Sequence, residues 1–213
     1  MRVGTDSVLL GAWAGVHPAQ RILDVGTGTG IIGLMTAQRN PTATVDAIDI
    51  QSTEVDLART NFQNSPWAER LHAHLCALQQ WQAPAYNHIV SNPPFFSSGQ
   101  KAPRATRAMA RHAESLPHAD LLMHAKRLLA EGGKLSVVIP ATEKSRLTEQ
   151  AQQHGLFVAR ECAVYSKPGK STERFLLEFT TLPHVPAITT LTLYDAVGMP
   201  SREYQRLTGD FYL

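Results

Sequence analysis

The sequence predicts an α/β protein of the doubly wound type: a mostly parallel, seven-stranded sheet with helices on both faces and an antiparallel hairpin near the C-terminal end. Three observations lead to this prediction. Segments with strand-like spacing alternate with segments of helical spacing, which is typical of a parallel sheet covered on both faces. A glycine-rich turn joins the first strand to a helix. Two later strand-like segments flank Lys167-Pro168-Gly169-Lys170, which has the composition of a turn.

The predicted elements follow one another in a regular order. Strands are expected at residues 21–24, 44–49, 71–75, 86–90, 134–139, 157–165 and 174–179. The spacing of apolar residues predicts helices at 31–37, 54–63, 118–129 and 144–153. Strand 134–139 is almost wholly apolar, which favours a central place in the sheet. Glu131, Gly132 and Gly133 are expected to end the helix that precedes it.

Length and composition indicate one globular domain, residues 1–213. The 213-residue chain is 43% hydrophobic and 18% charged, with a net charge of +2 that is compatible with nucleic acid without requiring it. No apolar run is long enough to span a membrane and no signal peptide opens the chain, so we expect a cytoplasmic protein. Cys76 and Cys162 and the nine histidines show no metal-ligand spacing, so we expect reduced thiols and no metal. We also expect a monomer.

A glycine-rich loop, Asp24-Val25-Gly26-Thr27-Gly28-Thr29-Gly30, lies between the first predicted strand and the first predicted helix. Glycines allow the backbone to approach a ligand closely, and the helix N-terminus adds polar N–H groups. We therefore expect Gly26, Gly28 and Gly30 to contact a cofactor. Asp24 either contacts the cofactor as well or braces the loop, and the sequence favours neither role. A tight turn without a ligand is the alternative for the whole segment.

A carboxylate about 20 residues beyond the glycine loop is typical of a nucleoside-binding site. Asp49 ends the second predicted strand, where a carboxylate can accept hydrogen bonds from both hydroxyl groups of a ribose. Ile50, Cys76 and Asn92 follow the second, third and fourth strands, and we include all three in the predicted cofactor site. The alternative for Asp49 is a solvated helix cap.

The segment Ser91-Asn92-Pro93-Pro94-Phe95-Phe96 follows the fourth strand and predicts the chemistry. An exocyclic or amide NH2 group is a poor nucleophile because its lone pair is delocalised. The side-chain oxygen of Asn92 and the carbonyl of Pro93 can accept its two N–H groups and turn the lone pair towards a methyl donor. Prolines make this backbone stiff, and Phe95 is expected to stack on a planar base. A strand ended by a proline turn is the alternative.

Basic residues beside this tetrad indicate a nucleic-acid substrate. The predicted RNA-binding residues are Lys101, Arg104, Arg107, Arg111, Lys167 and Lys170. The three arginines have the i, i+3, i+7 spacing of one helix face, and a basic face beside a base-sized pocket suits a phosphate backbone. The two hairpin lysines are expected to join this surface, because their turn belongs at the carboxyl edge of the sheet. A solvated charged face is the alternative.

Four segments together carry a family resemblance over essentially the whole chain. They are residues 3–13, which include Gly-Thr-Asp; 65–70, Ser-Pro-Trp-Ala-Glu-Arg; 91–96; and 207–213, which end in Phe-Tyr-Leu. This set resembles the tRNA(Val)-specific adenine N6-methyltransferases, which are Rossmann-like class I methyltransferases acting on the adenine beside the anticodon. The glycine loop and the Asn-Pro-Pro motif are shared more widely than the Gly-Thr-Asp and Phe-Tyr-Leu segments.

The resemblance implies S-adenosylmethionine as cofactor and tRNA as partner. It implies that the cofactor is bound by Thr5, Asp6, Asp24, Gly26 and Gly28, with its ribose on Asp49. It implies that Asn92, Pro93 and Phe95 hold the target amine.

The chain departs from the family at three places, and other activities share its motifs. Phe95 stands where the family usually has Tyr, and Ala77 stands where related enzymes commonly place an Asp that binds the adenine amine. The chain also begins almost at the Gly-Thr-Asp motif, where members usually carry a short upstream segment. The alternatives are a ribosomal RNA guanine N2-methyltransferase, a protein-glutamine methyltransferase acting on release factors, and a non-catalytic RNA-binding member of the fold.

Overall fold

The computed structural model describes residues 4–16, 20–93 and 116–212. The helices are α1 (Thr5–Trp13), α2 (Ile31–Arg39), α3 (Ser52–Gln63), α5 (His118–Leu128), α6 (Lys144–Gln153) and α7 (Arg202–Thr208), with short 3-10 helices η1 (Ala68–Arg70), η2 (Ala141–Glu143) and η3 (Gly209–Phe211). The strands are β1 (Arg21–Val25), β2 (Thr44–Asp49), β3 (Leu71–Leu75), β4 (Tyr86–Ser91), β5 (Leu129–Pro140), β6 (Phe157–Tyr165), β7 (Thr172–Thr180) and β8 (Ala187–Thr192).

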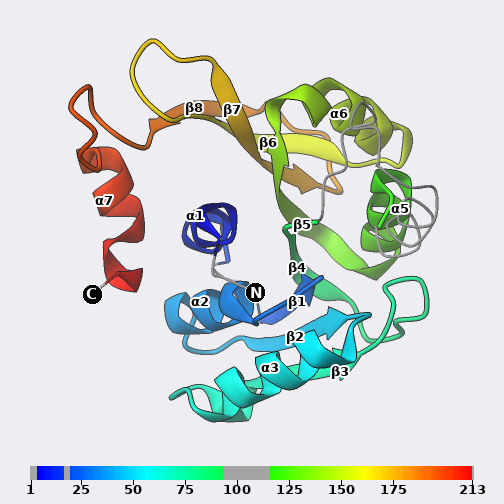
Figure 1. Ribbon diagram of the computed structural model, residues 1–213. Helices are drawn as coiled ribbons and strands as arrows, with labels where there is room; N and C mark the ends of the chain where they lie inside the picture. Colours follow the sequence, from blue (N-terminus) through cyan, green and yellow to red (C-terminus); the bar gives the residue numbers. More distant parts are fainter. Residues whose placement is uncertain (1–3, 17–19, 94–115, 213) are drawn as a thin grey trace, which may run out of the picture.

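The strands pair in the order β3-β2-β1-β4-β5-β7-β6-β8 (Figure 1). Strands β1 to β5 are mutually parallel, whereas β7 runs antiparallel to both β5 and β6. Along the chain, β1 is followed by β2 and β3 on one side of it, and β4 then lies on the other side of β1. The order of the sheet therefore reverses between β1 and β4, and doubly wound sheets bind their ligands beside such a switch point.

Within the described residues the sheet has eight strands, so the prediction of seven is wrong by one edge strand. The additional strand, β8, pairs in parallel with β6. Its first four residues are exposed, so it lacks the alternation of buried and exposed positions that reveals a half-buried strand in a sequence. Only its pairing with β6 makes this segment a strand.

The predicted hairpin is present as β6 and β7, and Gly169 in its turn has a positive φ of 75°. The helix before β5 ends at Leu128, close to the predicted end. Gly132 and Gly133, expected to lie outside regular structure, belong to β5. Gly132 has a φ of 69°, and the register against β4 shifts between the pairs at Tyr86 and His88. The two glycines therefore form an irregular start of a long strand, which is a usual place for glycine in a sheet.

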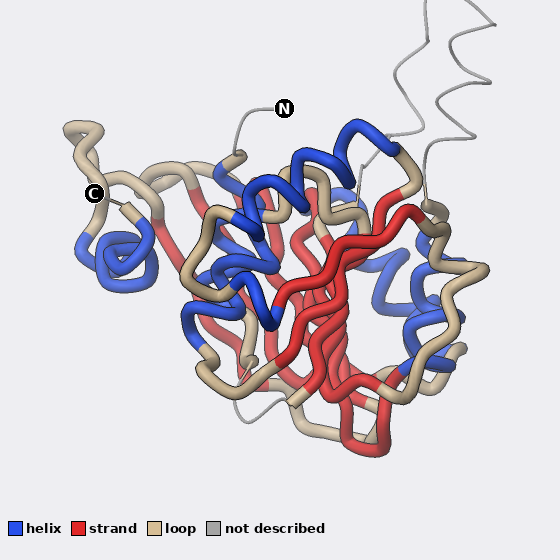
Figure 2. The backbone as a smooth tube through the Cα atoms, turned by 90° about the horizontal axis from the view of Figure 1, so that it is seen from below, coloured by secondary structure: helices blue, strands red, loops and turns tan. Residues whose placement is uncertain are grey.

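Helices cover both faces of the sheet, as predicted (Figure 2). Neighbouring residues of one strand point to opposite faces, so each strand supplies both cores. Ile22 and Val90 pack with α1, α2, α3 and α7, whereas Leu23 and Ile89 pack with α5 and α6. In the described ranges no helix has the length and apolarity needed to cross a membrane.

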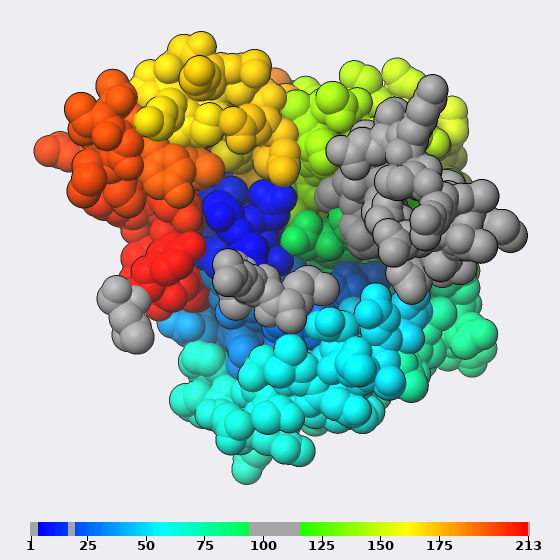
Figure 3. Space-filling view, in the orientation of Figure 1, coloured from blue at the N-terminus to red at the C-terminus, as the bar shows by residue number. Residues whose placement is uncertain are grey.

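Helix α1 occupies a central place on one face. It packs against α2 and α7 and contacts β5. Figure 3 shows this first helix, in dark blue, in the middle of the visible surface, between the later strands in yellow and the early elements in cyan. The start of the chain is therefore brought next to elements that lie far from it in the sequence.

Candidate active site

The glycine loop lies at the carboxyl end of β1 and leads into α2. Gly26, Gly28 and Gly30 have φ values of 70°, 53° and 80°, a region that favours glycine. A Cβ atom on Gly30 would lie 2.6 Å from the ring of Phe62, so this position has no room for a side chain. A Cβ atom on Gly26 would meet nothing within 4 Å. The loop is therefore tightly packed at Gly30 and has open space at Gly26, where a ligand could contact the backbone.

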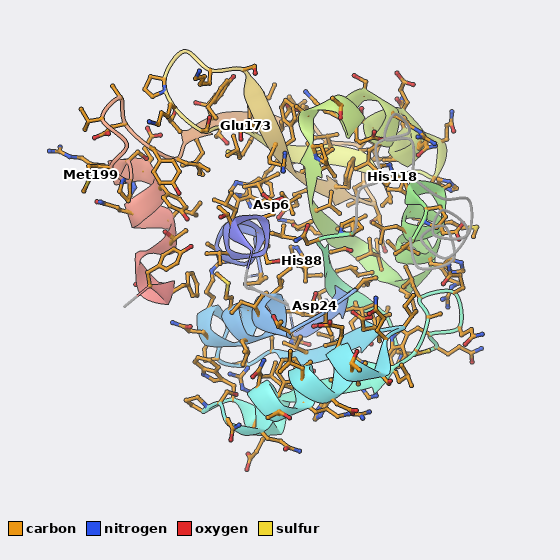
Figure 4. All side chains as sticks on the ribbon, viewed as in Figure 1. Asp6, Asp24, His88, His118, Glu173 and Met199 are labelled. Atoms are coloured by element: carbon orange, nitrogen blue, oxygen red, sulfur yellow. The ribbon has the colours of Figure 1, made fainter. Side chains whose placement is uncertain are left out.

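The side chain of Asp24 braces this loop by hydrogen bonding to residues within it and just after it. It is fully buried, and its Oδ2 accepts hydrogen bonds from Thr27 Oγ1 at 2.7 Å and from the Gly33 amide at 3.1 Å. Burial raises the pKa of Asp24 from 3.8 to about 6, against the lowering effect of these two hydrogen bonds. Of the two roles left open by the sequence, bracing is the one that these contacts describe. Figure 4 labels Asp24 beside α2 and β1.

Asp49 joins the end of β2 to the glycine loop. Its Oδ2 accepts from the Gly28 amide and its Oδ1 from the Gln51 amide, both at 3.0 Å. Each carboxylate oxygen keeps a lone pair for a ribose hydroxyl. Ile50 beside it is 47% exposed, and the half-buried Cys76 donates its amide to the Asp49 carbonyl at 3.0 Å. An acceptor pair next to an exposed apolar side chain fits a nucleoside.

A further carboxylate near the loop was not predicted. Glu54 lies in the first turn of α3, and a Cβ atom on Gly28 would be 3.9 Å from its Oε2. This Oε2 is buried and has no hydrogen-bond partner within the described residues. An acidic residue early in a helix is common, so nothing in the sequence marks Glu54 as a site residue. Open space at Gly26, the accepting oxygens of Asp49 and the orphaned Glu54 oxygen together fit the nucleoside end of S-adenosylmethionine.

Asn92 lies directly after β4, beside the glycine loop. Ser91 pairs with Val25, and its Oγ donates to the Val25 carbonyl at 2.9 Å, which fixes the end of β4 against β1. Asn92 is half-buried and Pro93 is buried. The Asn92 Nδ2 donates to Ser7 Oγ at 2.9 Å, and no described residue donates to its Oδ1. The glycine loop and the first residues of the Asn-Pro-Pro motif are thus neighbours at the ends of paired strands.

The start of α1 is held over the strand ends. Thr5 is exposed, and Asp6 Oδ2 accepts from Arg174 Nε of β7 at 3.0 Å. Figure 4 labels Asp6 on α1. Asp6, predicted to bind cofactor, is therefore engaged by an arginine. No spacing along the chain connects Ser7, Asn92 and Arg174, so their contacts could not be predicted from the sequence.

The predicted RNA residues fall into two groups. Phe95 and the basic residues Lys101, Arg104, Arg107 and Arg111 lie outside the described residues. Lys167, half-buried, and Lys170, exposed, occupy the turn between β6 and β7. Because β6 runs parallel to β1 and β4, this turn lies at the same carboxyl edge as Asn92, as predicted.

No metal site was predicted, and the described ranges contain no group of three or more His, Cys, Asp or Glu side chains able to hold a metal ion. The buried His88 on β4 instead bonds to Ser136 Oγ at 2.9 Å, and burial lowers its pKa to about 4. It is a neutral core residue at physiological pH.

Comparison with known proteins gives a family for this geometry. The family model described as methyltransferase small domain matches residues 4–158. The chain is 40% identical over 214 residues to a tRNA1(Val) (adenine(37)-N6)-methyltransferase of Aliivibrio fischeri and 41% identical to one of Tolumonas auensis. These matches cover 100% of this chain and 91% and 90% of the two relatives.

Solved structures show the same fold. A predicted O-methyltransferase from Agrobacterium tumefaciens matches with a TM-score of 0.77 at 17% identity, over 96% of each chain. TrmN from Thermus thermophilus matches with a TM-score of 0.56 at 21% identity, over 78% of this chain and 45% of TrmN. Both likenesses support a class I methyltransferase architecture.

Proposed function

This chain belongs to the methyltransferase small-domain family and, within it, to the tRNA1(Val) (adenine(37)-N6)-methyltransferases, and from this premise we propose how it acts. It is an S-adenosylmethionine-dependent enzyme that transfers a methyl group to the exocyclic N6 of an adenine in tRNA. By likeness to the named relatives, the target is adenine 37 of tRNA1(Val).

The observation that carries the proposal is the position of Asn92. It follows β4 at the switch point of the sheet, next to the glycine loop that follows β1. Ligands of doubly wound sheets bind at this place. A cofactor on the loop and an amine on Asn92 would therefore be neighbours, and such positioning is a large part of catalysis.

In the proposed mechanism, Asn92 Oδ1 and the Pro93 carbonyl accept the two N–H groups of the target amine. This turns the nitrogen lone pair out of conjugation. The chemistry that S-adenosylmethionine supplies when bound is a methyl group on a positively charged sulfur. As positive charge develops on the nitrogen, its N–H groups become stronger donors, so both hydrogen bonds strengthen in the transition state. The transfer breaks the sulfur–methyl bond and leaves S-adenosylhomocysteine, and the methylated nitrogen becomes neutral by releasing one N–H proton to water.

We assign the cofactor to the loop glycines and to the residues at the ends of β2 and β3. Asp49 takes the ribose hydroxyls, Ile50 and Cys76 line the base, and Asp24 supports the loop. Thr5 and Asp6 contribute from the start of α1. The contacts of Asp49 and Asp24 with the loop support this assignment.

We assign tRNA to the carboxyl edge of the sheet. Asn92 and the hairpin lysines share this edge, and the basic residues between 101 and 111 are part of the same proposal. The proposal further holds that the enzyme is one domain, a monomer, and cytoplasmic.

The test is transfer of labelled methyl groups from S-adenosylmethionine into unmodified tRNA, followed by nucleoside analysis. N6-methyladenosine is expected in the tRNA and absent with the Asn92→Ala variant. Ribosomal RNA and a release factor serve as competing substrates. Label in N2-methylguanosine or in methylglutamine, with none in tRNA adenine, would replace the proposal by one of those activities.

A further inference from the structure

The side-chain amide of Asn92 has one hydrogen-bonding partner in the described structure, and it comes from the far end of the chain. Nδ2 donates to Ser7 Oγ at 2.9 Å, a normal length for such a bond. The two residues are separated by 85 positions and belong to β4's end and to α1. The amide nitrogen is thus occupied, which leaves the amide oxygen for another donor.

We propose that Ser7 is a positioning residue that holds the Asn92 amide in the place and plane in which Oδ1 can accept from the target amine. This rests on the proposed function of Asn92 as the acceptor for that amine. Ser7 itself touches neither the amine nor the methyl group; it acts through Asn92.

The amide of an asparagine needs such a partner because its nitrogen donates hydrogen bonds whereas its oxygen accepts them. The terminal torsion of Asn is broad, so the group turns easily unless it is bonded. If it turned over, Nδ2 would face the N–H of the target amine, two donors against each other. In the orientation seen, the hydroxyl of Ser7 accepts from Nδ2 and holds the plane of the amide. Because a hydroxyl can also donate, the N–H groups of the bound amine select which end of the amide faces them, whereas an alanine at position 7 would leave the amide free to rotate.

Ser7 can serve in this way because α1 is fixed at both ends. Near its start, Asp6 Oδ2 accepts from Arg174 Nε at 3.0 Å. Just beyond its end, the Gly15 amide donates to the buried carboxylate of Glu178 at 3.1 Å. Contacts with β7 near both ends of α1 therefore fix the position of the Ser7 hydroxyl group. Groups that are already in position lower the free energy needed to reach the transition state.

The test compares Ser7→Ala with Ser7→Thr, which keeps the hydroxyl. Ser7→Ala is expected to lower kcat about threefold to tenfold, the range for one neutral hydrogen bond, and to leave binding of S-adenosylhomocysteine by calorimetry within about twofold. Ser7→Thr is expected to recover most of the loss. Ser201→Ala is the matched control, because Ser201 Oγ caps α7 by accepting from the Tyr204 amide at 3.0 Å. This control should lower stability and leave kcat unchanged.

A second measurement tests the hydrogen bond without turnover. The side-chain NH2 signals of Asn92 are identified by NMR from their loss in Asn92→Asp. Their exchange with water is expected to be at least about threefold faster in Ser7→Ala than in the wild type or Ser7→Thr.

Three results would overturn the role of Ser7: an unchanged kcat in Ser7→Ala, equal losses in the Ala and Thr variants, or unchanged exchange of the Asn92 NH2 group. Failure of the proposed function is a different result, namely a wild-type protein that makes no N6-methyladenosine in tRNA. The exchange measurement stands in either case.

Discussion

Replacement of Asp24 by asparagine should change how the stability of the protein depends on pH. The Asp24 carboxyl is fully buried, and burial raises its pKa from 3.8 to about 6. A carboxyl group whose pKa is raised by folding favours the folded state while it is protonated, so its contribution is fully present below pH 3.8 and is lost as the pH rises through about 6. Asparagine has nearly the same shape and does not titrate, so it removes this loss.

The magnitude follows from the two pKa values, which differ by about 2. Each pKa unit corresponds to about 1.4 kcal/mol. The full effect is therefore about 3 kcal/mol, and because part of it is already lost at pH 4, the free energy of unfolding of Asp24→Asn relative to the wild type should rise by about 2 kcal/mol between pH 4 and pH 7. The asparagine Oδ1 can still accept from Thr27 Oγ1 and the Gly33 amide, so the loop keeps its support.

The assay is urea unfolding followed by circular dichroism at pH 4, 5, 6 and 7, for both proteins. The difference between them isolates Asp24 from all other titrating groups. Asp56→Asn, at a carboxylate whose side chain is 72% exposed, is the control for removing a charge. Its difference from the wild type should vary by less than about 0.5 kcal/mol over the same range. If the difference in free energy of unfolding between Asp24→Asn and the wild type does not change with pH, the reasoning is refuted. The hydrogen bonds to the carboxylate would then offset the effect of burial on its pKa.

Three further predictions concern the proposed site. Asn92→Ala should lower methyl transfer at least about a hundredfold, because both accepted N–H bonds depend on this geometry, while S-adenosylhomocysteine binding by calorimetry stays within about threefold. Asp49→Ala should weaken S-adenosylhomocysteine binding at least about tenfold, because it removes the ribose acceptors and the brace on the Gly28 amide. Replacing Lys167 and Lys170 together by alanine should weaken tRNA binding and reduce the slope of log affinity against log salt by about 1.4 to 1.8.

Each of these has its own contrary outcome. Methyl transfer by Asn92→Ala at the wild-type rate would remove Asn92 from amine positioning. An unchanged dissociation constant in Asp49→Ala would leave Asp49 with only its loop contacts. For the lysines, Lys126→Ala in the last turn of α5 is the control, and equal salt slopes in the control and the double variant would return Lys167 and Lys170 to a solvated surface.

The order of the elements was predictable because local patterns specify strands and helices, and few ways of connecting them are allowed. The run before Asp24, the glycine loop and the apolar strand before Asn92 carry strong local signals. Given a mostly parallel sheet, these signals place the loop and Asn92 at one edge, and the pairing of Val25 with Ser91 confirms it. Strand β8 lacked such a signal, because its exposed residues do not alternate.

The sequence by itself determined the fold class, and it predicts the chemistry of the Asn-Pro-Pro motif, because both rest on residues close together in the chain. Only the tertiary structure decided that Asp24 braces the loop, that Glu54 leaves an oxygen unpaired near Gly28, and that Ser7 meets Asn92. These are contacts between side chains from different elements. Their geometry depends on how helices pack against the sheet, and no spacing along the chain records it.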